Sequence, residues 1–583
     1  MNLSAVYHIS TDNYCYPLDD NRLRIKLHTG NDVDSVTLVW GDPFDAGLFG
    51  SDMGWNGTHT EMEHSSRLLR HKVWEATVEP KFKRCRYFFI LKSGKEEFYY
   101  IESGFETPGQ FASYKGRRQD FYFPWMNSAD IIKPASWINE TIWYQIFPDR
   151  FCSSGKNTGL KYRKWASPKQ TVTNMQLYGG DLKGVESKLD YLKDLGVSGI
   201  YFTPLNESTS NHKYNTTDYL KIDEQFGTRD DMISLVKEAH KRGIRVMLDG
   251  VFNHSGTDFF AWQDVLKNGH DSKYFDWFMI HKYPFSKLGG KARRNEYYSF
   301  AFVDGMPKLN TNNDEVIDYF VDVCRRWVKE YDIDALRLDV ANEVSHKFNK
   351  KLREALFAIK PDFYIVGEIW HNSLPWLRGD EYDAVMNYSL QETIESFWRN
   401  ESMTALEFMY GVNECFDRYC EQTGNVMFNL LDSHDTMRLI TKCEGDEDAF
   451  YQELLTMFTL NGSVCFYYGT EVRLEGGHDP DCRRCMPWKQ IEKGDCDDRI
   501  AEMKKLISIR RDIPELRCGK LDFVKSGSDR VIVYEKSSDN KTYRVILNQS
   551  GIEYDTGEYK NVVYSRSLDG TALAHGGAAV LEV

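Results

Sequence analysis

Arg337 and Asp339 are residues whose types and spacing could do chemistry. They stand two positions apart in the segment ALRLDV, whose other residues are apolar. Residues two apart in a strand point to the same face, so these two side chains would lie together. A structural ion pair is one explanation of the pattern. The other is a carboxylate that the arginine holds in its ionised form for chemistry.

Other apolar segments also end in polar or ionisable side chains. These residues are Asp249, Asn253 and His254 at the end of IRVMLDGVFNH, Glu368 in FYIVGEIW, and His434 and Asp435 at the end of VMFNLLDSHD. If the segments are strands of one parallel barrel, their carboxyl ends meet at the same face. The carboxylates of Asp339, Glu368 and Asp435 would then share a pocket with histidines and an arginine.

This set of residues indicates acid–base and nucleophilic chemistry at a neutral group. It comes without a cysteine nucleophile or a phosphate-binding glycine loop. A glycosidic bond is cleaved by one carboxylate that attacks the anomeric carbon and a second that protonates the leaving oxygen. Asp339 beside Arg337 fits the ionised nucleophile. Glu368, within the largely apolar segment 365–370, fits the acid that must carry a proton near neutral pH.

A metal hydrolase is the alternative, because His254, His434, Asp249 and Asp435 could ligate a metal. The two histidines, however, are far apart in the sequence and show no HxH or HExxH spacing. Histidines that bond sugar hydroxyls explain them equally well, so we predict no metal in this pocket. The CxxC at 482–485 has no matching second pair and is a weak indication of zinc.

Strand-like apolar segments alternate with amphipathic helical segments from residue 141 onward. The strand segments are 141–148, 198–205, 244–252, 335–340, 363–370, 384–389, 426–434 and 463–469. This alternation predicts a parallel (β/α)8 TIM barrel, a fold whose sites form at the carboxyl ends of the strands. The connection from Asn253 to Asn310 has little helical pattern. It predicts a subdomain, about residues 255–309, inserted after the third strand.

Short strands separated by Gly, Asp and Asn flank the barrel region on both sides. They predict an N-terminal β-sandwich over residues 1–125 and a C-terminal β-sandwich over residues 506–583. The barrel domain would then occupy residues 126–505. The predicted fold class is therefore α/β, a barrel with an inserted subdomain and a β-sandwich at each end.

Composition limits the partners that the chain is suited to bind. A net charge of −14 argues against nucleic acid and against an anionic membrane. Aromatic residues reach 14%, which suits a neutral ligand such as a sugar. No apolar run approaches membrane-spanning length, and MNLSAVYHISTDNY lacks a signal pattern, so we expect a cytoplasmic location. The twelve cysteines are too sparse for a disulfide framework.

Several segments resemble, in order and spacing, the signature regions of the α-amylase family of glycoside hydrolases. They are DGVFNH (249–254), ALRLDVANEV (335–344), GEIWHN (367–372) and LLDSHDT (430–436). Three further segments resemble the neopullulanase, cyclomaltodextrinase and maltogenic amylase branch of that family. They are MPKLN (306–310), SNHKYNTTDY (210–219) and GGHDPDCRRCMPW (476–488). The resemblance extends over essentially the whole chain, and the N-terminal region resembles the starch-binding-type domain of this branch.

The resemblance implies a retaining hydrolase of α-1,4-glucosidic bonds that works by double displacement. Asp339 matches the nucleophile, Glu368 the general acid/base, and Asp435 the carboxylate that binds hydroxyls of the reacting glucose. The implied substrates are cyclomaltodextrins and maltooligosaccharides, with pullulan and starch as further candidates. Transfer to a second sugar is implied as a side reaction, and a homodimer formed through the N-terminal domain is implied as the assembly.

The resemblance also implies which residues bind the substrate. Arg337, His254 and His434 match residues that line the subsite of the reacting sugar, and Tyr214 matches the aromatic platform beneath that sugar. Glu343 and Trp370 match positions on the leaving-group side, which are associated with the choice between water and a sugar acceptor.

Two alternatives to this function remain. An α-glucosidase would normally lack both the N-terminal sandwich and the MPKLN-type motif. A non-catalytic carbohydrate-binding protein on the same fold would not need the three carboxylates, all of which are present.

The chain departs from its branch in the loop that follows PDRF. Relatives often have an Asn/Asp-rich loop there, which binds calcium together with a later GGD. Here the loop is CSSGKNTG (152–159), without a carboxylate, although Gly179, Gly180 and Asp181 remain. Calcium needs several oxygen ligands, usually including charged ones. We therefore predict that no cofactor is required and that this calcium site is lost or weak.

Overall fold

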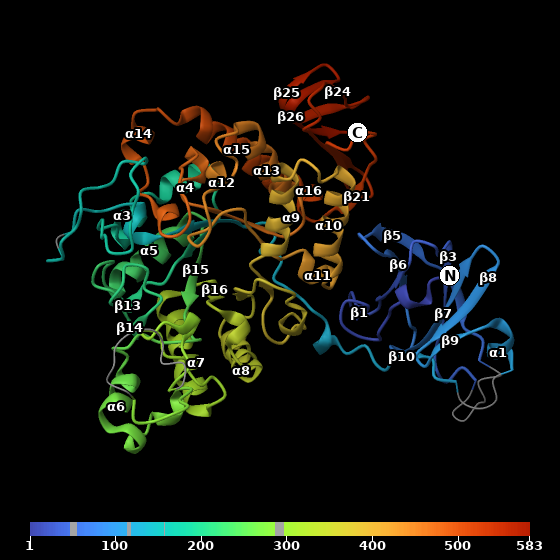
Figure 1. Cartoon of the computed structure of the whole chain (residues 1–583), viewed down its shortest axis with the longest axis horizontal. Coiled ribbons are helices and arrows are strands. Elements are labelled where there is room, and N and C mark those ends of the chain that lie inside the picture. The colour runs from blue at the N-terminus through green and yellow to red at the C-terminus, as the bar shows by residue number, and fades with distance from the viewer. Residues whose placement is uncertain (47–54, 114–117, 157, 286–295) are drawn as a thin grey trace.

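The structure is a computed structural model that describes residues 1–46, 55–113, 118–156, 158–285 and 296–583 (Figure 1). Residues 47–54 and 114–117 of the predicted N-terminal sandwich lie outside the described residues. So do residue 157 of the loop 152–159 and residues 286–295 of the predicted inserted subdomain.

Eight parallel strands of the described residues form the barrel. They are β11 (Ile142–Ile146), β12 (Gly199–Phe202), β15 (Arg245–Gly250), β16 (Ala335–Leu338), β17 (Tyr364–Gly367), β18 (Ala384–Val385), β19 (Phe428–Asn429) and β20 (Ser463–Tyr467). Their order in the sheet is β18-β17-β16-β15-β12-β11-β20-β19. A parallel bridge between Met386 and Phe428 joins the two ends, which closes the barrel and confirms the predicted fold.

Nearly every residue of these strands is buried, and the exception is Arg245 at the start of β15. Strands that are covered on both faces read as continuous apolar runs. That pattern is the reason why all eight could be recognised in the sequence.

Helices surround the barrel. In the described residues of this region they are α2 (Pro148–Phe151), α3 (Leu182–Glu186), α4 (Leu189–Leu195), α5 (Arg229–Lys241), α6 (Phe260–Asn268), α7 (Asp314–Tyr331), α8 (His346–Phe357), α9 (Tyr388–Arg399), α10 (Ala405–Asp417), α11 (Glu421–Gly424), α12 (Leu439–Lys442), α13 (Glu447–Thr459), α14 (Trp488–Glu492), α15 (Asp497–Asp512) and α16 (Pro514–Cys518). The connection from β17 to β18 departs from the regular alternation. Its described residues contain only the short 3₁₀ helix η8 (Leu374–Trp376).

Local sequence explains the longest of these helices, α7. Asn313 caps it by accepting a hydrogen bond from the backbone N–H of Glu315. Asp314 and Glu315 in its first turn stabilise the positive end of the helix dipole. Apolar residues recur at helical spacing and are buried against the barrel. Asp332 ends the helix in a left-handed conformation.

An excursion follows β15, as the sequence predicted. It contains α6, which the weak helical pattern of the segment did not indicate. A bridge between His254 and Lys308 ties the excursion to the barrel mouth, and a second bridge, between Ser299 and Pro307, lies within the excursion. A further hairpin, β13 (Asn206–Ser208) and β14 (Thr216–Ile222), follows β12 and was not foreseen.

The N-terminal domain packs two antiparallel sheets face to face. Its described strands are β1 (Cys15–Pro17), β2 (Leu23–Thr29), β3 (Ser35–Gly41), β4 (Thr58–Glu61), β5 (Glu63–Arg67), β6 (Lys72–Val78), β7 (Cys85–Ser93), β8 (Glu96–Ile101), β9 (Gly104–Glu106) and β10 (Phe121–Phe123). The domain lies beside α10 and α11 (Figure 1). Lys26 and His28 of β2 contact Asp417 of α10 at 3.2 and 2.6 Å.

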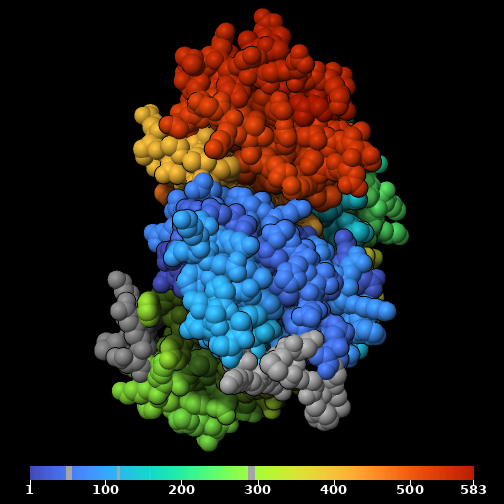
Figure 2. Space-filling view, turned by 90° about the vertical axis from the view of Figure 1, so that its right-hand side faces the viewer, coloured from blue at the N-terminus to red at the C-terminus, as the bar shows by residue number. Residues whose placement is uncertain are grey.

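The C-terminal strands form one antiparallel sheet in the described residues. They are β21 (Lys520–Phe523), β22 (Val531–Ser537), β23 (Thr542–Asn548), β24 (Tyr554–Asp555), β25 (Asn561–Asp569) and β26 (Ala572–Glu582). Alternate residues of β22 divide between two cores: Ile532 joins the barrel core, whereas Val531 joins a small separate cluster. The predicted boundary at residue 505 lies inside α15. In space, this C-terminal part adjoins the N-terminal domain (Figure 2).

Among the described residues, no helix combines the length and the apolar character that crossing a membrane requires.

Candidate active site

Arg337 lies at the centre of a cluster of carboxylates at the carboxyl ends of the barrel strands. It belongs to β16, and its side chain is 0% exposed. Its Nη1 is 2.8 Å from Asp249 Oδ1 and 3.0 Å from Asp339 Oδ1, and its Nη2 is 2.9 Å from Glu368 Oε2. The strand periodicity therefore does bring Arg337 and Asp339 together. Both explanations of the sequence pattern fit these contacts, because the same guanidinium contacts Asp249, Asp339 and Glu368.

Asp339 directly follows β16. Burial raises the pKa of its carboxyl group well above its ordinary value; Arg337 acts in the opposite direction, and Glu368 and Asp249 add to the rise. Arg337 thus favours the ionised form of Asp339, as the sequence predicted, but against burial and like charges that the sequence could not show.

The backbone turns sharply after Asp339. Val340 has φ 46° and ψ 45°, a left-handed conformation that is costly for a β-branched residue. This turn directs the backbone N–H of Val340 to Glu368 Oε2 at 2.9 Å. The strained residue therefore links the two carboxylates that the sequence assigned to chemistry.

Glu368 follows β17, and polar donors contact both of its carboxylate oxygens. Oε2 accepts from Val340, and Oε1 accepts from Trp370 Nε1 at 3.1 Å. The apolar surround that the sequence predicted for this carboxylate is therefore wrong at the carboxylate itself. The neighbouring residues Ile365 and Ile369 are buried in the barrel core.

Asp435 and His434 follow β19 and contact each other and an arginine. His434 Nε2 is 3.1 Å from Asp435 Oδ2, and Arg483 Nη2 is 3.3 Å from Asp435 Oδ1. Burial raises the pKa of Asp435, and Arg483 acts against this rise. Burial, followed by Arg483 and Arg337, lowers the pKa of His434 well below its ordinary value, so the imidazole is neutral.

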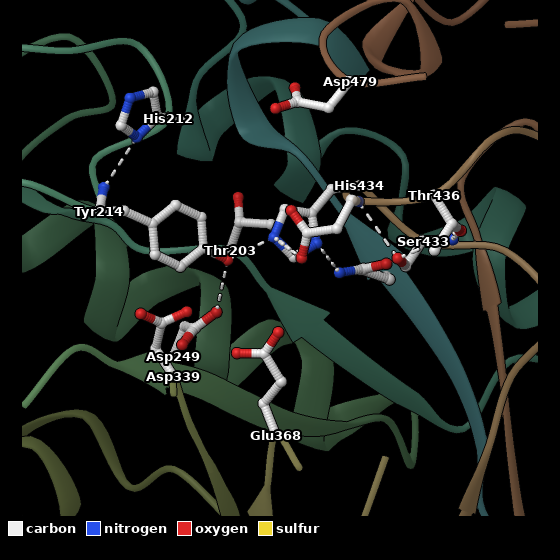
Figure 3. A network of polar contacts seen from close by, with 12 residues as sticks. Thr203, His212, Tyr214, Asp249, Asp339, Glu368, Ser433, His434, Thr436 and Asp479 are labelled. Atoms are coloured by element: carbon white, nitrogen blue, oxygen red, sulfur yellow. Dashed lines mark hydrogen bonds and ion pairs between the residues drawn. The ribbon is translucent and has the colours of Figure 1, made fainter. Parts of the chain in front are cut away.

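Tyr214 stands beside His434, although the two residues are 220 positions apart (Figure 3). Their rings stack with centroids 5.4 Å apart and an interplanar angle of 7°. The Tyr214 hydroxyl also donates to Asp249 Oδ2 at 3.0 Å. His254 Nε2 is 3.1 Å from the carbonyl oxygen of Tyr214, and its ring stacks on Phe300. The structure thus brings the predicted sugar-binding residues to the same place as the carboxylates.

The two residues predicted on the leaving-group side lie in different settings. Trp370 is 53% exposed and stacks on Tyr388 with centroids 3.5 Å apart. Glu343 forms an ion pair with Lys308 at 2.9 Å, and Lys308 also contacts Asn253. Trp370 lines the cavity described next, whereas Glu343 is not among its lining residues.

A cavity of about 430 Å³ opens over these carboxylates. Its described lining residues are Asn174, His212, Tyr214, His254, Phe300, Met306, Asp339, Val340, Asn342, Glu368, Trp370, Asp435, Asp479 and Arg483. A larger cavity, of about 660 Å³, lies where the N-terminal domain meets α10, α11 and residues 518–521. The catalytic candidates do not line it, so the smaller cavity is the candidate active site.

Sequence reasoning missed several lining residues. Six of them stand inside motifs that the resemblance uses, namely His212, Met306, Val340, Asn342, Asp479 and Arg483. Their motifs carried the signal, but nothing in the spacing said which members face the cavity. Asn174 belongs to no motif that we identified, and only the fold brings it to Arg483, at 3.2 Å.

The residues around the predicted calcium loop are engaged with each other. The Asp181 carboxylate accepts hydrogen bonds from the hydroxyl of Ser154 at 2.5 Å and from the backbone N–H of Gly184 at 2.6 Å. Asp149 accepts from the backbone N–H groups of Tyr178 and Gly179. These donors already engage the Asp149 and Asp181 carboxylates, the charged groups nearest to the predicted calcium loop. Among the described residues, no cluster of three or more His, Cys, Asp or Glu side chains is placed to hold a metal.

Comparison with known proteins extends over nearly the whole chain. Residues 145–512 match the family description "Alpha amylase, catalytic domain", and residues 1–126 match "Alpha amylase, N-terminal ig-like domain". The chain is 43% identical over 556 residues to a cyclomaltodextrinase of Geobacillus thermopakistaniensis (strain MAS1), which covers 94% of this chain and 92% of that protein. It is 43% identical over 559 residues to a maltogenic alpha-amylase of Bacillus acidopullulyticus, with the same coverage of 94% and 92%. A solved structure of a cyclomaltodextrinase matches with a TM-score of 0.88 at 36% identity, covering 100% of this chain and 98% of that chain.

Proposed function

The chain belongs to the α-amylase family of glycoside hydrolases, and from this membership we propose that it hydrolyses α-1,4-glucosidic bonds with retention of configuration. The observation that carries the proposal is the contact of one guanidinium with both Asp339 and Glu368. Carboxylates held as near neighbours favour the short separation, about 5 Å, that a retaining mechanism needs.

In the first step Asp339 attacks the anomeric carbon while Glu368 gives its proton to the leaving glycosidic oxygen. The bond between that carbon and oxygen breaks, and a β-glycosyl ester of Asp339 forms. Arg337 supports this step because it favours the ionised nucleophile against the effect of burial. The Trp370 indole N–H, 3.1 Å from Glu368, holds the acid in place.

In the second step Glu368 takes a proton from water, whose oxygen attacks the anomeric carbon and releases Asp339. The product regains the α configuration. A sugar hydroxyl can replace the water, which gives transglycosylation. Trp370 is half-exposed beside Glu368 and offers such a sugar an aromatic face.

Asp435, His434 and Tyr214 would bind the glucose that reacts. His434 is neutral, because burial and two arginines lower its pKa, so it can donate to one hydroxyl or accept from another. The Tyr214 ring offers the flat apolar face that sugars stack on. Tyr214 and His434 are 220 positions apart in the sequence and meet only in the folded barrel (Figure 3).

We propose cyclomaltodextrins and maltooligosaccharides as the substrates. The relatives are named cyclomaltodextrinase and maltogenic alpha-amylase. A cavity of about 430 Å³ suits a short stretch of sugar units better than a long polymer. Pullulan and starch are the less favoured substrates of this proposal.

A homodimer formed through the N-terminal domain is part of the proposal. None of the described lining residues of the cavity belongs to the N-terminal domain, so this domain does not complete the cavity of its own subunit. It exposes Phe44 and Phe82, whose ring centroids are 4.7 and 5.8 Å from the Arg84 guanidinium. Elution as a strict monomer in gel filtration at micromolar concentration would contradict the dimer.

We also propose that the protein acts in the cytoplasm and needs no cofactor. All twelve cysteines are described, and all of them are free thiols, which suits a reducing compartment. Hydrogen bonds from Ser154 and Gly184 already occupy the Asp181 carboxylate of the predicted calcium site.

The product profile from β-cyclodextrin, pullulan and soluble starch, measured side by side, tests the function. We expect fast ring opening to maltose and glucose, slow attack on starch, products that are α-anomers by NMR, and no activity in Glu368→Gln. Starch cleaved as fast as cyclodextrin would instead indicate a general α-amylase. Release of single glucose units from chain ends would indicate an α-glucosidase. No turnover on any substrate would leave a carbohydrate-binding protein.

A further inference from the structure

Two irregular loops form one wall of the cavity. Asn174 belongs to the first loop, and Asp479 and Arg483 belong to the second. Described residues 158–180 contain no helix or strand, and residues 473–487 contain only a single 3₁₀ turn. Loops of this kind take their position from tertiary contacts rather than from their own hydrogen bonds.

The side chain of Arg150 contacts both of these loops. Arg150 lies in α2, directly after β11, and its side chain is 0% exposed. Its Nε donates to Asp149 Oδ2 at 2.6 Å, and its Nη1 donates to the carbonyl oxygen of Arg483 at 2.9 Å. Its Nη2 donates to the carbonyl oxygens of Thr173 at 3.2 Å and Gln176 at 2.9 Å. One buried guanidinium, whose charge is balanced by Asp149, therefore donates hydrogen bonds to both loops.

The second loop contacts the candidate reaction centre through the side chain of Arg483. Arg483 Nε donates to the carbonyl oxygen of His434 at 2.8 Å, and its Nη2 is 3.3 Å from Asp435 Oδ1. Its Nη1 contacts Asn174 Oδ1 at 3.2 Å and Asp479 Oδ1 at 2.9 Å. Asp479 lies across the site from Glu368, on the side away from the proton donor (Figure 3). This wall therefore faces the sugars that stay on the enzyme when the leaving group departs.

We propose that Arg150 is a positioning residue for substrate binding: it fixes the wall of Asn174, Asp479 and Arg483 against the retained sugar chain. The inference rests on the proposed function, and it adds a residue that touches no substrate. Arginine is required because its planar fork presents five donors in fixed directions. A lysine would keep the charge beside Asp149 but could not reach both loops at once.

Arg510 provides a matched control for the purely structural role of a buried arginine. It is also 0% exposed, and it donates to the carbonyl oxygens of Phe458 and Leu460 at 2.8 and 2.9 Å and to that of Gly462. These residues do not line the cavity. Arg510→Lys therefore removes a similar set of hydrogen bonds without disturbing the wall.

The experiment compares kcat/KM for maltotetraose with kcat/KM for an aryl α-glucoside. Maltotetraose can place several sugars on the side that stays on the enzyme when the leaving group departs, whereas the aryl α-glucoside places only one sugar there. In Arg150→Lys we expect the ratio of the two values to fall about tenfold, the worth of one hydrogen bond to a charged group, mainly through KM. In Arg510→Lys we expect the ratio of the two values to stay unchanged, even if its thermal midpoint falls as much as that of Arg150→Lys. A double-mutant cycle of Arg150→Lys with Asn174→Ala should be non-additive for maltotetraose, because both changes act on one wall.

An unchanged ratio in Arg150→Lys, or an additive cycle, would overturn the inference and leave the proposed function intact. No cleavage of either substrate by the wild-type protein would overturn both. Should Arg150→Lys fail to fold, Tyr178→Leu keeps the test open. It removes the ring 4.8 Å from the Arg150 guanidinium, and a smaller fall in the same ratio is expected, whereas no fall would count against the inference.

Discussion

Replacing Arg337 with methionine tests how the reaction centre keeps its carboxylates charged. The side chain is fully buried, and its guanidinium is 2.8 to 3.0 Å from oxygens of Asp249, Asp339 and Glu368. Methionine fills similar space but leaves these carboxylates without their cation. Removing one partner of a buried ion pair costs about 3–5 kcal/mol, so we expect a loss of that order in the free energy of unfolding at neutral pH.

The direction of the pH dependence follows from the pKa values. In the wild-type protein burial already raises the pKa of Asp339 and of Asp249, and Arg337 opposes both rises. Without Arg337 both pKa values rise further, and the folded state binds protons that the unfolded state does not. The stability difference between wild type and variant should therefore be largest at neutral pH and should shrink as the pH falls. The acidic limb of kcat/KM should move to higher pH, because the nucleophile must be ionised.

Urea denaturation at several pH values between 5 and 8, together with the pH profile of kcat/KM, measures both effects. A stability loss that is the same at every pH would show that Arg337 acts by packing rather than by charge. An acidic limb that stays in place would show that Arg337 does not control the ionisation of Asp339. Either result would refute the reasoning.

Three other predictions follow from the same structure. Asp339→Asn should lower turnover by roughly three orders of magnitude or more and leave the circular dichroism spectrum unchanged, because the amide cannot form the ester; residual turnover within tenfold would reject Asp339 as the nucleophile. Incubation with excess EDTA should change neither turnover nor the thermal midpoint, because protein donors occupy the oxygens of Asp181; a loss restored by calcium would contradict this. Burial lowers the pKa of Lys536 to about 7, so the unfolded state binds more protons above that pH, and the stability of the wild type relative to Lys536→Met should rise between pH 7 and pH 9 in urea titrations. A constant difference between the two proteins would show that Lys536 stays protonated.

The strands and their chemistry could be read from the sequence because both depend on local patterns. Buried parallel strands are continuous apolar runs, and each of the eight segments became a barrel strand. A barrel brings the carboxyl ends of its strands to one face, so Asp339, Glu368 and Asp435 could be placed in one pocket before any contact was known. The pairing of Arg337 with Asp339 followed from the strand period alone.

Helices and loops were less predictable, for a physical reason. The crossover from β17 to β18 has only η8, and α6 formed where the pattern was weak. Short elements gain little from their own hydrogen bonds and exist because the barrel packs against them. The C-terminal strands were recognised, but how they share apolar faces with the barrel depends on docking that no strand period encodes.

The electrostatic character of the site was decided by the tertiary structure. The sequence placed Glu368 in an apolar segment, yet its oxygens accept from Val340 and Trp370 and contact Arg337. The sequence placed Arg337 beside Asp339, yet burial raises the pKa of Asp339 against that arginine. A pKa depends on how much water the fold removes and on charges brought from other strands, so residue types and spacing alone do not fix it.

The sequence by itself determined which residues could react, and the fold determined which residues hold them. Asp339 and Glu368 could be identified in the sequence because they stand at strand ends and inside motifs. Arg150 reaches Thr173 and Arg483, which is 333 positions away, only because the closed barrel brings their loops to the end of β11. Side chains repeat with a period of two residues in a strand and 3.6 residues in a helix, so these periods show which residues share a face of one element. Contacts between irregular loops have no such period, and they form only when the chain closes on itself.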